Sequence, residues 1–78
     1  MMNMIDIIKI ELRAVGGYRI QELDDLSIKI MFTNCILIIS ETYKNVWIKK
    51  TNYYNEVLEI RTYETLEDII EYIEKNEN

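Results

Sequence analysis

Histidine and proline are absent from this chain of 78 residues, and cysteine and glycine are scarce. Without histidine the sequence lacks the usual general base and the commonest metal ligand, which excludes histidine-based catalytic triads and zinc sites. The single cysteine, Cys35, cannot form an internal disulfide, which agrees with a reducing compartment. Because four aliphatic residues follow it, we predict that Cys35 is a buried structural thiol and no nucleophile.

Long apolar runs are also absent. No stretch of about 18 uncharged apolar residues could span a membrane, and Asp6 and Lys9 interrupt the region where a signal peptide would be continuously apolar. We therefore expect a cytoplasmic protein with no membrane partner, which would lie in the host cytoplasm if a phage encodes it.

Motifs for cofactors and metals are missing as well. Gly16-Gly17 does not have the spacing of a phosphate loop and suits the end of a helix better. The acidic pairs Asp24-Asp25 and Glu67-Asp68 lack calcium-loop spacing, and turn and cap roles explain them better. The sequence predicts no cofactor, no metal site and no enzymatic activity.

Hydrophobic residues make up 49% of the sequence, and fifteen of them are isoleucine. A chain of this length buries only about 60% of the surface that it exposes when unfolded, so this apolar content is what makes an independent fold plausible. No linker or repeat divides the chain, and we expect a single domain over residues 1–78.

The first segment, residues 4–15, fits two periodicities. Apolar and charged residues alternate from Ile8 to Ala14 as in a strand, whereas Asp6, Lys9 and Arg13 share one face of a helix. We favour the helix, because Asn3 is an acceptable N-cap and Gly16-Gly17 supplies a left-handed stop.

The sequence pattern in the middle of the chain predicts an antiparallel sheet of four to five strands. The candidate strand segments are residues 18–23, 26–33, 35–39, 46–50 and 57–63. Asp24-Asp25 is the expected turn of the first hairpin. Residues 35–39 are apolar on both faces, which predicts a central strand covered on both sides. In the last segment the alternation predicts that Leu58 and Ile60 are buried and that Glu59 and Arg61 are exposed.

The final segment is an amphipathic acidic helix. Thr65 precedes Asp68 by three residues in a variant of the capping box, and apolar residues follow at helical spacing, namely Leu66, Ile69, Ile70 and Ile73. We therefore predict an α+β fold of two layers: an N-terminal helix, the antiparallel sheet and the C-terminal helix. Both helices could cover one face of the sheet and leave the other face open.

Negative charge is concentrated at the C-terminal end. Residues 55–78 hold eight acidic and two basic residues, whereas the rest of the chain is nearly neutral. Helical spacing aligns side chains about 5 to 6 Å apart, similar to the spacing of phosphates in nucleic acid. This row would consist of Glu64, Glu67 or Asp68, Glu71, Glu74 and, at its end, Glu77, and the residues that we expect to bind the partner are Glu64, Glu67, Asp68, Glu71 and Glu74. It predicts a surface that binds a basic protein, although an ordinary solvated helix face has the same pattern.

A second candidate surface is aromatic and cationic, with Tyr43, Trp47, Tyr53 and Tyr54 among Lys44, Lys49 and Lys50. Aromatic residues beside cations suit protein hot spots and single-stranded nucleic acid, but overall acidity argues against direct binding of nucleic acid. We expect Trp47 and Tyr54 to be apolar anchors for a protein partner. The tyrosines could equally cover the open sheet face or the seam of a homodimer.

The order of elements over residues 2–42 resembles that of small acidic phage anti-CRISPR proteins that inhibit Cas9. The segments that carry the resemblance are MNMIDIIKIEL, the turn into Tyr18-Arg-Ile, SIKIMF and ILIISET, together with the acidic C-terminal helix. The family implies a protein that is not an enzyme and mimics DNA, with acidic side chains on the Cas9 surface that receives the PAM duplex. Residues 46–63 have no counterpart in that family.

Three functions therefore stay open at the level of sequence. The first is an inhibitor that binds a nucleic-acid-handling protein through the acidic helix, most concretely an anti-CRISPR protein acting on a CRISPR effector. The second is an immunity protein or antitoxin that blocks a basic toxin with the same surface. The third is a homo-oligomeric structural module whose open sheet face pairs with a second copy.

Overall fold

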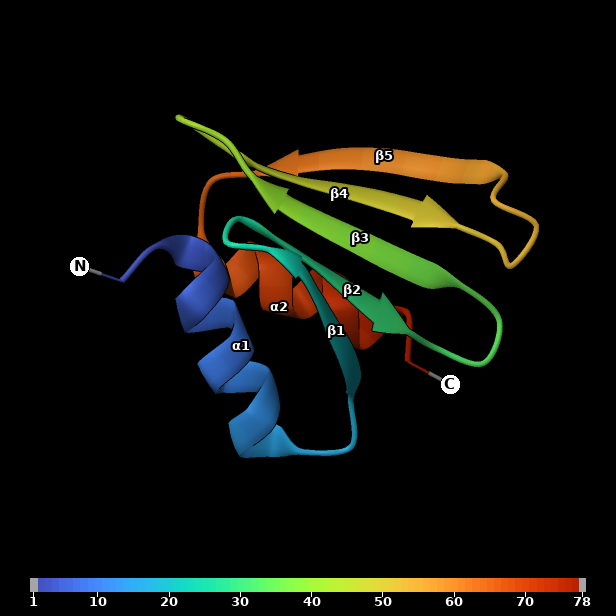
Figure 1. Cartoon of the computed structure of the whole chain (residues 1–78), viewed down its shortest axis with the longest axis horizontal. Helices are drawn as coiled ribbons and strands as arrows, with labels where there is room; N and C mark the ends of the chain where they lie inside the picture. Colours follow the sequence, from blue (N-terminus) through green and yellow to red (C-terminus); the bar gives the residue numbers. More distant parts are fainter. Residues whose placement is uncertain (1, 78) are drawn as a thin grey trace.

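The computed structural model describes residues 2–77 and confirms the α+β fold (Figure 1). Helix α1 comes first, five strands follow, and helix α2 ends the chain. Their bounds are α1 Met4–Val15, β1 Arg19–Asp24, β2 Ser27–Met31, β3 Ile36–Glu41, β4 Val46–Thr51, β5 Val57–Tyr63 and α2 Leu66–Lys75. The first segment is thus a helix with the predicted limits.

The strands form one antiparallel meander in which each strand pairs with the next, so β3 is central and β1 and β5 are the edges. Both helices lie on the same side of this sheet (Figure 1). Helix α1 contacts β3 and α2, and α2 also contacts β5. The structure therefore has two layers with an open sheet face, and the double cover expected for β3 is wrong.

The hydrophobic core fills the space between the helices and the sheet. Three residues of α1, three of α2 and six from β2, β3 and β4 form it: Ile5, Ile8, Leu12, Ile69, Tyr72, Ile73, Ile28, Ile30, Leu37, Ile39, Val46 and Ile48. All of the strand residues among them except Leu37 are β-branched, which suits a pleated sheet surface. This core fixes α2 on the sheet and so determines which face of α2 meets solvent.

The ends of α1 follow from its flanking residues. The Asn3 side chain accepts a hydrogen bond from the Asp6 backbone N–H (3.0 Å), and the Asp6 carboxylate accepts one from the Asn3 N–H in return (3.3 Å), which completes a capping box. Gly16 ends the helix with φ 83° and ψ 165°. This extended region with positive φ is open only to glycine, so the stop is not the left-handed helical turn that we expected.

Helix α2 begins as predicted, because the Thr65 hydroxyl accepts a hydrogen bond from the Asp68 backbone N–H (3.3 Å). Ile69, Tyr72 and Ile73 point into the core. Leu66 and Ile70 are only partly buried and pack at its margin. The margin of α2 is therefore apolar but still accessible.

The first hairpin turns one residue later than expected, at Asp25-Leu26. Asp24 is the last residue of β1, and its carboxylate accepts hydrogen bonds from the Leu26 N–H (2.8 Å) and the Ser27 hydroxyl (2.7 Å). These bonds lower the pKa of Asp24, with that from Ser27 the strongest cause. The aspartate thus stabilises a turn that contains no glycine.

The prediction for β5 is wrong, because Leu58 and Ile60 are 53% and 56% exposed. The register with β4 places Arg61 opposite the buried Ile48, so Glu59 and Arg61 lie on the helix side of the sheet. A bulge of β5 opposite Thr51 shifts the pairing by one residue and so determines which side chains of β5 face the helices. At the edge of the sheet, polar groups on the helix side still reach water or a partner, and the apolar residues of β5 face outward on the open side.

Candidate functional site

Three of the predicted acidic residues line a groove between the two helices. Glu67, Glu71 and Glu74 are exposed on α2, at spacings of four and three residues that place them along one stripe. Leu66 and Ile70 form the apolar floor, and Glu11 of α1 stands on the opposite wall, in a shallow hollow of about 580 Å³. We call this the acidic groove. The sequence did not predict the contribution of Glu11, which depends on how α1 packs against α2.

The carboxylates of the acidic groove are not neutralised by the described part of the chain. The ion pairs within residues 2–77 join Lys9 to Asp6 and Glu22, and Arg61 to Glu59. None of them involves an acid of the groove. Its field therefore remains available to a positively charged partner.

The other two predicted acids lie elsewhere. Glu64 precedes α2 and lines a different hollow, which it shares with Tyr43 and Lys44 in the turn between β3 and β4. Asp68 lies in the first turn of α2 and is not part of the groove lining. The five acids predicted to bind the partner are thus a stripe of three with two neighbours that diverge from it.

The two predicted aromatic anchors do not join the acidic groove. Trp47 is 44% exposed on the open sheet face, the side opposite to the helices, because it alternates with the buried Val46 and Ile48. Tyr54 is 86% exposed in the turn after β4. Since strands rise about 3.3 Å per residue, that turn begins at least about 13 Å from Trp47. A single flat partner surface cannot contact the groove and both aromatic side chains.

The open sheet face gathers cations and apolar side chains. The register aligns Gln21, Lys29, Ile38, Lys49 and Ile60 in one row across the sheet, and Arg19, Met31, Ile36, Thr51 and Val57 in the next, with no acidic residue in either row. A hollow of about 260 Å³ lies beside Ile38, Trp47 and Ile60. The sequence pattern could not show this grouping, because it depends on strand register. The protein is therefore acidic on its helix side and cationic and apolar on its sheet side.

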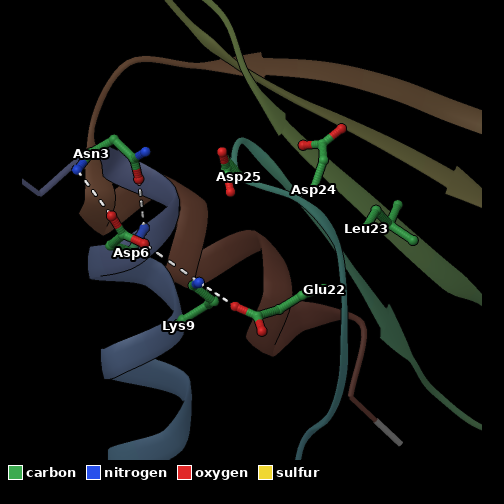
Figure 2. Close-up of a pocket in the computed structure, with 7 residues that line it drawn as sticks. All are labelled: Asn3, Asp6, Lys9, Glu22, Leu23, Asp24 and Asp25. Carbon is green, nitrogen blue, oxygen red and sulfur yellow. Dashed lines mark hydrogen bonds and ion pairs between the residues drawn. The ribbon is translucent and has the colours of Figure 1, made fainter.

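A further hollow separates α1 from the hairpin of β1 and β2 (Figure 2). Lys9 reaches across it, with Nζ 2.5 Å from Glu22 Oε1 and 3.4 Å from Asp6 Oδ1. The bond between Lys9 and Glu22 is the main cause that raises the pKa of Lys9 and lowers that of Glu22. Asp24, which also lines the hollow, already serves the hairpin turn. These bonds join α1 to β1 and give the hollow a structural role.

Two other features bear on chemistry. Cys35 is 5% exposed, as predicted, and burial raises the pKa of its thiol, which disfavours the reactive thiolate. Among residues 2–77, no group of three or more cysteine or acidic side chains is arranged to hold a metal ion. The helices described for these residues are too short and too polar to cross a membrane.

Comparison with known proteins adds no relative. No protein-family model matches the sequence, and neither the curated proteins nor the solved structures gave a match. The functional argument therefore depends on the surfaces described above.

Proposed function

We propose that this protein inhibits a nucleic-acid-handling protein by placing its acidic groove on the basic surface that normally receives DNA or RNA. The observation that carries the proposal is the stripe of Glu67, Glu71 and Glu74, which is exposed, has no ion pair within residues 2–77, and faces Glu11 across the groove. A helix holds these carboxylates at fixed spacing, so a partner meets a preorganised row of negative charge.

The apolar floor suits the same kind of partner. Lysine and arginine have long aliphatic stems that lie on apolar surface while their charged ends stay in a polar environment. In the acidic groove the stems would lie on Leu66 and Ile70, and the charged ends would reach the carboxylates on either side. Opposite charges on the two proteins also increase the rate at which they associate, and this increase becomes smaller as the salt concentration rises.

The most concrete form of the proposal is an anti-CRISPR protein that acts on Cas9, in keeping with the resemblance in element order. The acidic groove would then occupy the Arg- and Lys-lined surface that binds the PAM duplex. An immunity protein or antitoxin would use the same groove against a basic toxin. The identity of the captured partner distinguishes the two.

Affinity capture from bacterial lysates that contain CRISPR effectors tests the proposal with two matched variants. The site variant is Glu71→Lys/Glu74→Lys, and the control is Asp25→Lys/Glu56→Lys, at exposed positions outside the groove. Both replace two acids with two lysines, so the net charge is the same. Mass spectrometry compares the proteins retained by each variant and by the parent chain.

We expect the parent and control proteins to retain the same nucleic-acid-binding protein, and the site variant to lose it. Equal retention by the site and control variants would show that the position of the acids in the groove does not matter, and would overturn the proposal. A partner without a nucleic-acid-binding surface would also overturn it.

A further inference from the structure

Strand β5 is an open sheet edge. It is seven residues long, contains no glycine or proline, and has no neighbouring strand on its outer side within residues 2–77. The other edge, β1, carries a bulge near Leu23 and is tied to α1 through the ion pair between Glu22 and Lys9. Such features protect an edge against pairing. Strand β5 also has a bulge, but only at its start, between Val57 and Glu59, and residues 59–63 beyond it pair regularly with β4.

The side chains of β5 are divided between the two faces of the sheet. Leu58, Ile60 and Thr62 belong to the open face, because Ile60 and Thr62 lie opposite Lys49 and Trp47 of β4. Glu59 and Arg61 belong to the helix side. The centre of the strand is therefore the apolar Ile60 on the open face, and its two neighbours in the chain, one acid and one base, lie on the helix side.

We propose that β5 pairs antiparallel with β5 of a second copy, about a two-fold axis at Ile60, so that one sheet continues through both copies. This pairing places Ile60 opposite its own copy, Leu58 opposite Thr62, and Glu59 opposite Arg61 of the second copy. Opposite charges that face each other across strands stabilise a pair of strands, and like charges destabilise it.

The charges select this register over its neighbours. Side chains alternate between the two faces of a sheet, so a shift of one strand against the other keeps the open faces of both copies on the same side only if it is by an even number of residues. A two-fold axis at Glu59 would oppose two glutamates, and an axis at Arg61 would oppose two arginines. Among these three central registers, only the axis at Ile60 pairs each charge with its opposite.

The charged groups are already oriented for this contact. Arg61 Nη2 lies 2.7 Å from Glu59 Oε2 within the strand, and the Tyr72 hydroxyl donates to Glu59 Oε1 at 2.5 Å. A guanidinium has five N–H donors, so Arg61 can keep its own Glu59 and also reach that of the second copy. The seam would carry four charges of alternating sign, a network in place of an isolated exposed pair.

Apolar contacts on the open face favour the same pairing. Val57, Leu58 and Ile60 are each more than half exposed, and Ile60 borders the hollow beside Trp47. Pairing of the β5 strands would cover Ile60 and bring the two hollows to either side of the seam.

The two-fold axis would be perpendicular to the sheet, so both helix layers would lie on one side. This inference does not depend on the proposed function, but a dimer would present two acidic grooves to the same side.

Charge reversal tests the pairing by sedimentation velocity over a range of protein concentrations. We expect the parent chain to dimerise. Arg61→Glu and Glu59→Arg should each weaken the dimer by roughly tenfold or more, because each variant opposes like charges at both symmetry-related positions. Mixed in equal amounts, the two variants should form a heterodimer, since every opposing pair is then of opposite sign. A monomeric parent chain, or two variants that fail to associate when mixed, would overturn the inference.

Cysteine cross-linking tests the register independently, in a Cys35→Ala background. Directly opposed residues have Cα atoms about 4.5 to 5.5 Å apart, which is within the range of a disulfide. Ile60→Cys should therefore form a covalent dimer on mild oxidation. In Thr62→Cys the two cysteines would be four positions apart, about 13 Å, and should not cross-link. Equal cross-linking of the two variants, or none in Ile60→Cys, would contradict the register.

Discussion

Replacing Glu74 with lysine should stabilise the fold even though it damages the proposed site. Glu74 lies in the last turn of α2, where the partial negative charge of the helix end disfavours an acid. It also lies three residues after Glu71, close enough to repel it. Reversal converts both effects from unfavourable to favourable.

The two contributions give the expected size of the effect. A favourable charge at a helix end contributes about 0.3 to 1 kcal/mol, and a side-chain pair at this spacing about 0.2 to 0.5 kcal/mol in either direction. Glu74→Lys should therefore raise the free energy of unfolding by about 1 kcal/mol. For a domain of this size the melting temperature should rise by about 4 to 8 °C.

Urea unfolding and thermal melts, followed by circular dichroism at low salt, measure this change. Glu74→Gln is the control and should give about half the gain, since it removes the charge without reversing it. At 1 M salt the Debye length is about 3 Å, so most of the gain should disappear. A loss of stability in Glu74→Lys would refute the reasoning, because it would mean that the carboxylate makes a stabilising contact.

Four further predictions concern the fold. Thr65→Ala should lower the free energy of unfolding by about 1 kcal/mol through loss of the α2 cap, and Gly16→Ala by about 1 to 3 kcal/mol because of its backbone conformation. Ile48→Ala should cost about 2 to 5 kcal/mol by opening a cavity in the core. Urea unfolding measures all three. Burial, assisted by Glu77, raises the pKa of Tyr18 from 10 to about 12, so the unfolded chain loses its proton first and stability should fall as pH rises through this interval. Burial and the bond to Glu59 also raise the pKa of Tyr72, which contributes to the same alkaline limb, so Tyr18→Phe should make this limb shallower without abolishing it.

Matched variants keep these predictions specific. Thr65→Ser retains the capping hydroxyl and should leave stability nearly unchanged. Ile60→Ala removes an exposed isoleucine and should cost far less in the monomer than Ile48→Ala. Equal losses at the two isoleucines would contradict the assignment of the sheet faces. An unchanged alkaline limb in Tyr18→Phe would contradict the assignment to Tyr18.

Local signals made the helices predictable from sequence. Asn3 and Thr65 cap the two helices through bonds to residues three positions later. These interactions lie within one turn of the chain, so the sequence contains nearly all the information that they need. The apolar spacing of α2 placed Ile69 and Ile73 in the core correctly, but it did not include the buried Tyr72, and Leu66 and Ile70 are only partly buried. The start of the first hairpin was misplaced by one residue, because Asp24 supports the turn through its side chain and does not form it.

The faces of β5 depended on a contact that the sequence pattern does not contain. Leu58 and Ile60 alternate with Glu59 and Arg61, and hydrophobicity alone places the aliphatic pair inside. Pairing with β4 and the bulge opposite Thr51 reverse that choice. The stripe of acids on α2 could be predicted from sequence, because its members belong to one helix. The participation of Glu11 could not, because it depends on how α1 packs against α2.

The most direct test of the acidic groove is a competition for nucleic acid on the captured partner, with the Cas9–guide complex and a PAM-containing duplex as the named case. Fluorescence anisotropy of the labelled duplex reports its release as the protein is added. We expect the parent chain and Asp25→Lys/Glu56→Lys to displace the duplex, and Glu71→Lys/Glu74→Lys to leave it bound. Displacement by all three proteins alike, or by none of them, would contradict the claim that this groove occupies a nucleic-acid site.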